Sequence, residues 1–260
     1  MIDQLSTAIA SVVDALEAGR VRAAEPDWSR PGGWRVNEDV KAAILDVFRD
    51  RTTTDWHAGP FTFRDRAALG PRDVRDGPWR IVPGGTTVRR GAYLGQDVVV
   101  MPPSYVNVGA WIGDDTMVDS LVLVGSCAQI GSRVHLAAGV TIGGVLEPPG
   151  ARPVIVEDDA FVGAGSSLLE GVLVGRGAVI GAGVVLTGTS RLYDLVRQVV
   201  HVGSPAAPLV VPPGAVVVPG SRALRDSFAA GHGVAIATAI IIKDRDERTD
   251  ARAALEEALR

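Results

Sequence analysis

Aliphatic residues recur every six positions through the middle of the chain. The series runs from Val82 to Ile142 in one phase, and it resumes at Val156 and continues to Leu192 after a short insertion at residues 147–153. A small or β-branched residue follows each aliphatic residue four positions later, so two positions of every six face inward. Neither a helical period near 3.6 nor a simple strand alternation keeps this phase for so long. The pattern therefore predicts a repetitive β structure.

Glycine commonly follows the aliphatic position of a hexad, as at Gly95, Gly113 and Gly131. A corner between two short strands can require backbone angles that are costly for other residues. The alternative is a phosphate-binding loop, which needs its glycines between a strand and the start of a helix. We therefore interpret these glycines as corner residues.

Two helices are predicted before the repeat, in a small N-terminal domain at residues 1–80. The second helix is expected from Glu38 to Arg49, with Asn37 as its N-cap. Residues 25–33 are rich in proline and glycine and predict a loop between the helices. Five apolar residues fall on one face of the first helix: Leu5, Ile9, Val12, Val13 and Leu16.

The repeat is expected to form a second domain at residues 81–192, followed by a C-terminal extension at residues 193–260. Several prolines between residues 205 and 219 interrupt regular structure in this extension. Residues 234–242 are strongly apolar and predict a strand. Residues 250–260 predict a short helix with an apolar side and a charged side.

The composition narrows the partners and the compartment. The 260 residues are 47% hydrophobic but only 5% aromatic, which suits a core of small and β-branched side chains. The net charge of −4 and the absence of long Lys or Arg runs give no reason to expect a nucleic-acid partner. The apolar stretches are too short to cross a membrane. A single cysteine and an N-terminus without a signal-peptide pattern predict a cytoplasmic location.

Five short sequence motifs inside the repeat resemble those of one protein family, the tetrahydrodipicolinate N-succinyltransferases, which are hexapeptide-repeat proteins. The resemblance extends over most of the chain. It implies a left-handed parallel β-helix with a small helical N-terminal domain and a short C-terminal extension of strand and helix. The handedness comes from the resemblance alone, because general rules favour right-handed crossovers in about 98% of cases. The motifs are Met117-Val118-Asp119-Ser120, residues 124–131 (VGSCAQIG), Val134-His135-Leu136, residues 142–148 (IGGVLEP) and Leu169-Glu170-Gly171.

The resemblance also implies an activity and an assembly. The activity is the transfer of a succinyl group from succinyl-CoA to the amine of tetrahydrodipicolinate, in the diaminopimelate route to lysine. The assembly is a homotrimer with active sites between the chains. Two alternatives stay open: the same fold acting with acetyl-CoA or on a related amino dicarboxylate, and an inactive prism that serves as a scaffold.

Other activities of such prisms fit the residues less well. A zinc site of three histidines is not expected, because only His135 of the four histidines lies within the repeat. A nucleotidyltransferase would need a large nucleotide-binding domain before the repeat, for which about eighty residues are too few. We therefore expect no metal cofactor.

By resemblance, Asp119 and Glu170 match the acidic residues of the family's active site, and Asp119 also contacts the substrate. A carboxylate is a suitable acceptor for the proton that an amine loses when it attacks a thioester. The alternative is that both are solvated corner residues. Arg80 matches the family's substrate-binding arginine, whose planar fork suits a carboxylate, and Arg89 and Arg90 are weaker candidates.

The hexad count separates Asp119 from Glu170. Glu170 lies two coils further along and on another face, which places the two about 10 Å apart along the axis if coils stack at about 4.8 Å. Both acids can serve one substrate only if neighbouring chains supply them. Lys243, near the end of the chain, is a candidate for binding a phosphate of CoA.

The remaining reactive residues are interpreted as structural. No histidine is placed by sequence to activate Cys127, and His135 is expected to pack or to form a hydrogen bond. The chain departs from the family pattern at Thr62, which matches a frequent lysine, and at Gly165 and Ser167, which match an arginine and a glutamate. Residues 49–52 (RDRT) also differ from the family's RIND-like segment. These departures leave the choice of acyl donor and acceptor open.

Overall fold

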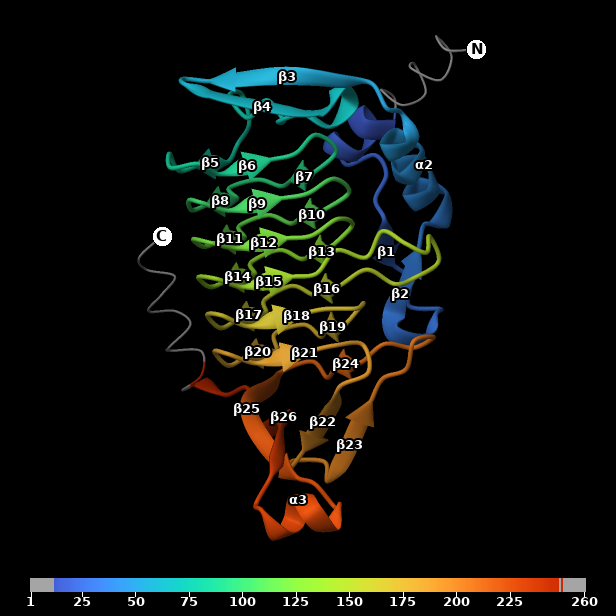
Figure 1. The fold of residues 1–260 in the computed structure, drawn as a ribbon, viewed down its shortest axis with the longest axis vertical. Coiled ribbons are helices and arrows are strands. Elements are labelled where there is room, and N and C mark those ends of the chain that lie inside the picture. Colours follow the sequence, from blue (N-terminus) through green and yellow to red (C-terminus); the bar gives the residue numbers. More distant parts are fainter. Residues whose placement is uncertain (1–11, 248, 250–260) are drawn as a thin grey trace.

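The computed structural model describes residues 12–247 and 249, and its centre is a triangular prism of stacked coils (Figure 1). Three parallel sheets form the faces of this prism. The chain passes through sheet 1, sheet 2 and sheet 3 in turn, because each strand pairs with the strands three places earlier and later in the chain. The predicted left-handed parallel β-helix is confirmed.

The strands of the prism contain two residues each, apart from the longer β25. Sheet 1 contains β5 (Arg80–Ile81), β8 (Val99–Val100), β11 (Met117–Val118), β14 (His135–Leu136), β17 (Phe161–Val162), β20 (Val179–Ile180) and the start of β25 (Ala215–Ala223). Sheet 2 contains β6 (Thr87–Val88), β9 (Tyr105–Val106), β12 (Leu123–Val124), β15 (Thr141–Ile142), β18 (Ser167–Leu168) and β21 (Val185–Leu186). Sheet 3 contains β7 (Tyr93–Leu94), β10 (Trp111–Ile112), β13 (Gln129–Ile130), β16 (Ile155–Val156), β19 (Leu173–Val174) and β24 (Val210–Val211).

Both inward positions of the hexad fill the core. From Val88 to Leu192 the aliphatic residues of the repeat are at most 4% exposed. Polar residues occupy the second inward position where a hydroxyl can bridge two coils. The Ser104 Oγ donates to the Asp119 carbonyl oxygen at 2.8 Å and accepts from the Val122 amide at 3.1 Å. Thr116 and Ser166 repeat this arrangement, so the buried hydroxyls are satisfied.

The first coil differs from the expected phase. Val88 pairs with Val106 at the regular spacing of three hexads, but Ile81, and not Val82, pairs with Val100. One additional residue therefore lies in the first corner, and the expectation that Val82 faces inward is wrong by one position. Gly84 and Gly85 have φ values of 143° and 97°, which only glycine adopts readily, and they accommodate this longer corner.

The sheets continue beyond the last hexad at residue 192. The chain leaves the prism as an antiparallel hairpin of β22 (Arg191–Asp194) and β23 (Val199–Val202), and then returns. On its return, β24 pairs with β19, and the start of β25 pairs with β20. Residue 192 thus marks the end of the sequence repeat, while the prism itself extends to the start of β25.

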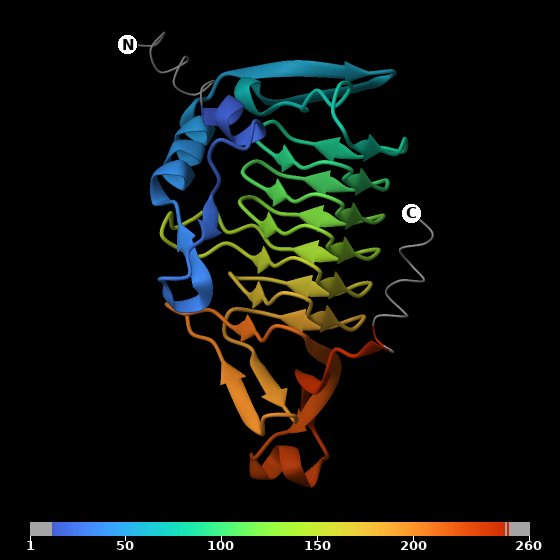
Figure 2. The same ribbon diagram turned by 180° about the vertical axis from the view of Figure 1, so that it is seen from behind.

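The N-terminal segment covers sheet 3 (Figures 1 and 2). Residues 12–17 are helical, and α2 spans Glu38–Arg49 as predicted. The expected loop at residues 25–33 is in part a strand, because β1 (Ala24–Pro26) pairs antiparallel with β2 (Trp34–Val36) around the 3-10 turn η1 (Pro31–Gly33). A second hairpin, β3 (Thr53–Ala58) and β4 (Phe61–Arg66), and the turn η2 (Ala67–Leu69) complete the segment.

Asn37 lies at the N-terminus of α2 but does not cap it with its side chain. Its Nδ2 atom donates to the carbonyl oxygen of Arg22 at 2.9 Å instead. Asn37 is therefore the N-cap residue as expected, but it lacks the side-chain bond of a cap because a contact with the preceding segment takes its amide group. Glu38 and Asp39 place negative charge in the first turn, where it interacts favourably with the helix dipole.

The C-terminal extension continues sheet 1 beyond the end of the prism (Figure 1). The predicted strand is confirmed as β26 (Ala235–Asp244), which pairs with both β25 and β22. The short helix α3 (Ser227–Gly231) connects β25 to β26. The helix predicted at residues 250–260, like Leu5 and Ile9, lies outside the described residues. No helix in the described part of the chain is long and apolar enough to cross a membrane.

Candidate functional site

Each coil consists of one strand from each sheet in chain order, and the first coil is β5, β6 and β7. Asp119 follows β11, at the corner where the third coil (β11, β12 and β13) turns from sheet 1 to sheet 2. Its side chain is half-buried, and its Oδ1 atom accepts from the amide of Ser120 at 2.6 Å. Its carbonyl oxygen accepts from the buried hydroxyl of Ser104 in the preceding coil. The backbone that carries Asp119 is therefore held by the core, while its carboxylate reaches the surface.

Glu170 follows β18, at the corner where the fifth coil turns from sheet 2 to sheet 3, and it is exposed. Its φ of 54° lies in the left-handed region, and that of the next residue, Gly171, is 74°. At the same corner of earlier coils, only the second residue, Gly109 or Cys127, has a positive φ. A left-handed non-glycine residue costs about 1–3 kcal/mol, so the surroundings must hold Glu170 in this conformation.

The structure does not bring Asp119 and Glu170 together within one chain. The strands before them, β11 and β18, lie in different sheets, and in sheet 2 the strand β15 lies between β12, which follows Asp119 in the same coil, and β18. Two coil steps correspond to about 10 Å along the axis.

Arg80 and Lys243 lie at opposite ends of sheet 1. Arg80 is an exposed residue of β5, the first strand of that sheet, and two coils separate it from Asp119. Lys243 pairs with Val216, near the other end. Its Nζ atom lies 2.7 Å from an Asp246 carboxylate oxygen, so its charge already has a partner. One chain therefore does not assemble the four predicted residues into a single cluster.

Arg89 and Arg90 are bound within the chain. The Arg89 guanidinium contacts Asp65 and donates to the Leu69 carbonyl oxygen at 2.9 Å, with only 11% of the side chain exposed. Arg90 contacts Asp14 and Glu17. These contacts tie the N-terminal segment to the first coil, so both arginines have structural partners.

Cys127 and His135 both face packed surroundings. Cys127 is fully buried between the prism and the N-terminal segment, beside Ile44 and Val108, and burial raises the pKa of its thiol to about 12. His135 is 9% exposed, and its ring meets the edge of Phe161 at a centroid distance of 5.1 Å. Within the described part of the chain, no group of three His, Cys, Asp or Glu side chains could hold a metal ion.

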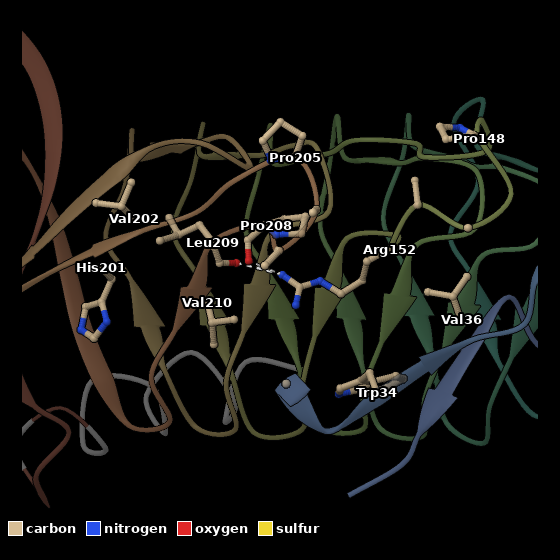
Figure 3. A pocket seen from close by; sticks show the side chains of 15 residues that line it. Trp34, Val36, Pro148, Arg152, His201, Val202, Pro205, Pro208, Leu209 and Val210 are labelled. Carbon is tan, nitrogen blue, oxygen red and sulfur yellow. Dashed lines mark hydrogen bonds between the residues drawn. The ribbon is translucent and has the colours of Figure 1, made fainter. Parts of the chain in front are cut away.

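A groove of about 800 Å³ lies beside the excursion at residues 147–153 (Figure 3). Its walls come from the excursion, from β2 and from residues 201–210. The buried Lys41 of α2 fixes the excursion, because its Nζ donates to the carbonyl oxygens of Ala151 at 2.5 Å and Pro148 at 3.3 Å. Sequence analysis expected residues 147–153 to project near a cofactor-binding groove but assigned no binding role to the residues that line this one.

Arg152 lies in this groove and was also missed by the sequence analysis. Its Nε atom donates to the Gly171 carbonyl oxygen at 2.8 Å. One terminal nitrogen donates to the carbonyl oxygens of Pro208 at 2.7 Å and Leu209 at 3.1 Å. Burial lowers the pKa of the guanidinium to about 10, so it remains charged at neutral pH. An arginine between Ala151 and Pro153 carries no sequence signal for these contacts, which join segments distant along the chain.

Opposite Arg152, at the far end of the groove, His201 is oriented by a buried acid. Its Nε2 atom lies 3.0 Å from Asp194 Oδ2, and the Asp194 side chain is fully buried. The other Asp194 oxygen accepts from the amides of Val196 and Arg197. This network closes the hairpin of β22 and β23 and fixes the wall of the groove.

Comparison with known families supports the sequence resemblance. Residues 2–49 match the family described as tetrahydrodipicolinate N-succinyltransferase N-terminal. Residues 109–144 match the bacterial transferase hexapeptide repeats, and residues 153–188 match the hexapeptide repeat of succinyl-transferase.

Whole-chain relatives give the same result. The 2,3,4,5-tetrahydropyridine-2,6-dicarboxylate N-succinyltransferase of Xylella fastidiosa is 41% identical over 99% of this chain and 90% of its own length. That of Rhodopseudomonas palustris is 42% identical over the same shares of the two chains. A solved structure from Campylobacter jejuni, provisionally assigned as a 2,3,4,5-tetrahydropyridine-2-carboxylate N-succinyltransferase, has a TM-score of 0.53 and 18% identity. It covers 90% of this chain and 62% of its own, and this likeness concerns the fold alone.

The burial of Cys127 predicts an unreactive thiol. In the native protein at pH 8 the thiol stays protonated, because its pKa of about 12 lies far above that pH. We expect Ellman's reagent to label native protein very slowly and denatured protein at once. The raised pKa also stabilises the folded state below about pH 9, and this contribution is lost as pH rises towards 12. Rapid labelling of the native protein at pH 8 would contradict the packing around Cys127.

Proposed function

The chain belongs to the tetrahydrodipicolinate N-succinyltransferase family, and from this premise we propose that it transfers an acyl group from an acyl-CoA to the amine of an amino dicarboxylate. The proposed donor is succinyl-CoA, and the proposed acceptor is the hydrated or ring-opened form of tetrahydrodipicolinate, in the diaminopimelate route to lysine. The observation that carries this proposal is the 41% identity over almost the whole chain with a relative of that name. We place the reaction in the cytoplasm.

The proposed chemistry is direct transfer in a ternary complex. The amine nitrogen attacks the thioester carbonyl, a C–N bond forms, and the C–S bond then breaks to release the CoA thiol. The nitrogen must lose a proton in this sequence, and a positioned carboxylate accepts it. Glu170 is the proposed acceptor, because it is exposed and its carboxylate makes no side-chain hydrogen bond among the described residues. Asp119, whose carboxylate is already fixed by the Ser120 amide, is proposed to bind and orient the amine.

A homotrimer is proposed because each chain alone separates these two acids. The N-terminal segment covers sheet 3, which leaves sheets 1 and 2 for contacts with other chains. Sheet 2 and the corner before it expose apolar side chains, with Leu121 67%, Leu123 38% and Val185 57% exposed. Burial of such residues between prisms would stabilise an assembly with a rotation axis parallel to the prisms.

An acetyl donor or a related amino dicarboxylate is the second candidate, and Gly165 favours it. The family pattern has an arginine where this chain has Gly165, at the sheet 1 to sheet 2 corner of the fifth coil. Gly165 has a φ of 68°, and a Cβ built there would meet no atom within 4 Å. The site therefore has open space where the family pattern places a large cation, which changes what it can recognise.

A thiol-release assay tests the proposed function. We expect purified protein to release CoA thiol from succinyl-CoA only when the tetrahydrodipicolinate acceptor is present. The buried Cys127 will not contribute to the Ellman signal, which keeps the background low. Faster release from acetyl-CoA would transfer the assignment to the second candidate. No release with either donor would identify the chain as an inactive scaffold and contradict the proposal.

Complementation tests the sharing of one site by two chains. Asp119→Asn and Glu170→Gln trimers should each lose most activity, since a positioned carboxylate contributes about a hundredfold to ten-thousandfold. If each site takes one acid from each of two chains, every mixed trimer has one intact site of three. Random mixing in equal amounts then restores about one quarter of wild-type activity.

Two controls accompany this experiment. Wild-type protein taken through the same denaturation and refolding must regain its activity. Asp119→Asn chains mixed with chains carrying both substitutions must stay inactive, since no intact pair can form. Verified hybrids without activity would show that both acids act from one chain, contrary to the shared site.

Arg80 is proposed to bind a substrate carboxylate with its planar fork. A lysine supplies only a point charge, so Arg80→Lys should weaken this contact without removing the charge. We expect the KM of the acceptor to rise at least about tenfold, as for the loss of a charge-assisted hydrogen bond, while the KM of the acyl donor stays almost unchanged. Initial rates with each substrate varied in turn measure both values. Equal changes in the two constants would argue against the assignment.

A further inference from the structure

The corner that carries Glu170 departs from the regular geometry of the prism. Val108 and Ser126 occupy the equivalent position in the second and third coils, and neither has a positive φ, whereas Glu170 does. Two successive left-handed residues are the signature of a type I′ turn, while a single one at the second position fits a type II turn. The sign of φ sets the direction in which the Cα–Cβ bond leaves the corner. The conformation of Glu170 therefore directs its side chain differently from that of its counterparts.

Arg152 is the polar side chain that binds this corner. It donates to the carbonyl oxygen of Gly171 and to those of Pro208 and Leu209, and Figure 3 shows its guanidinium reaching that segment. It thereby joins three separate parts of the chain: the excursion, the Glu170 corner and the segment that leads into β24. Among the described residues Arg152 forms no ion pair, so a partly buried cation is balanced by carbonyl dipoles alone.

The backbone packs closely around the same corner. A Cβ on Gly171 would lie 2.4 Å from the carbonyl oxygen of Arg152, and a Cβ on Gly188 would lie 2.5 Å from that of Glu170. The corner is thus enclosed by the excursion on one side and by the next coil on the other. Such contacts can hold a backbone conformation that is unfavourable in isolation.

We infer that Arg152 is the positioning residue that fixes the left-handed Glu170 corner and so directs the Glu170 carboxylate towards the acceptor amine. This inference rests on the proposed function. It deepens that function by giving the excursion a role in the reaction. The excursion supplies the guanidinium that binds the backbone beside the proton acceptor Glu170 and so fixes its conformation. Arg152 does not touch the reacting atoms, and its effect on catalysis passes entirely through Glu170.

A partly buried cation without a carboxylate partner is a costly way to hold a loop for stability alone. Removing a guanidinium from water is unfavourable, and a well-packed apolar side chain often stabilises a fold equally well. The guanidinium has a feature that an apolar residue lacks, namely several donors in a rigid plane that can bind three carbonyl oxygens at fixed angles. This feature suits a position where the exact backbone geometry matters.

The test is a double-mutant cycle between Arg152 and Glu170. Arg152→Met removes all donors and keeps an unbranched side chain of similar reach. Misplacement of a catalytic group by about 1 Å can cost a hundredfold in rate, so we expect kcat to fall about tenfold to a hundredfold, with both KM values almost unchanged. In the Glu170→Gln background the same substitution should have no further effect on kcat.

Arg176→Met is the matched control. Arg176 is another arginine, at the sheet 3 to sheet 1 corner of the coil that carries Glu170. Its side chain is 56% exposed and pairs with Asp158 and Asp159. We expect this variant to keep the wild-type kcat. Thermal denaturation of every variant checks that the fold is intact. Arg152→Lys, which keeps the charge and loses the fork, should fall between the wild type and Arg152→Met, and it replaces Arg152→Met if that variant does not fold.

The outcomes separate the inference from the proposed function. Absence of acyl transfer by the wild type would remove the proposed function and the inference with it. An active wild type in which Arg152→Met lowers kcat by the same factor with Glu170 present or replaced would overturn the inference alone, because Arg152 would then act independently of Glu170. An unchanged kcat in a folded Arg152→Met variant would overturn it equally.

Discussion

The packing of two residues out of every six into a narrow triangular core is the constraint on which the rest of the molecule depends. Strands of two residues leave room for an inward aliphatic side chain and one outward side chain, and a second inward residue closes each corner. Nearly all side chains available for chemistry therefore lie at corners or on outward strand positions. A regular core thus provides a rigid frame, and the corners supply the variation that a site needs.

The N-terminal segment determines which faces of this frame are available. Arg22 shows how the segment is attached: its guanidinium lies 4.1 Å from the ring centroid of Trp111, and its Nε atom donates to Gln129 Oε1 at 2.8 Å. Trp34 extends the contact by donating to Glu157 at 2.9 Å. Outward residues of sheet 3 therefore bind the N-terminal segment through Arg22 and Trp34. The acids Asp119 and Glu170 lie at the two corners that bound sheet 2.

Sequence periodicity predicted the elements that depend on local patterns. The six-residue repeat predicted the prism and its inward residues. An amphipathic run predicted α2, and an apolar run predicted β26. The first coil was placed one residue out of phase because the flexible backbone at Gly84 and Gly85 accommodates an extra residue that leaves no mark on the apolar pattern. The return of β24 and β25 to the prism was missed because it follows a hairpin that interrupts the repeat.

The residues of the candidate site that lie in short sequence motifs could be predicted, whereas those defined by long-range contacts could not. Asp119 and Glu170 could be named because each lies in a short word of sequence, and their separation followed from counting coils. The contacts of Arg152 could not be predicted, because the excursion that carries it meets Gly171, Pro208 and Leu209 only where three segments distant along the chain come together at one corner.

The positive φ of Glu170 could not be predicted either, since the second and third coils adopt another conformation at the equivalent residue. A regular repeat makes such an exception informative. At the corner from sheet 2 to sheet 3, where Val108 and Ser126 lack a positive φ, an acid held in a costly conformation beside a partly buried guanidinium marks the place where the fold is adapted to chemistry, and the excursion that supplies this guanidinium departs from the repeat.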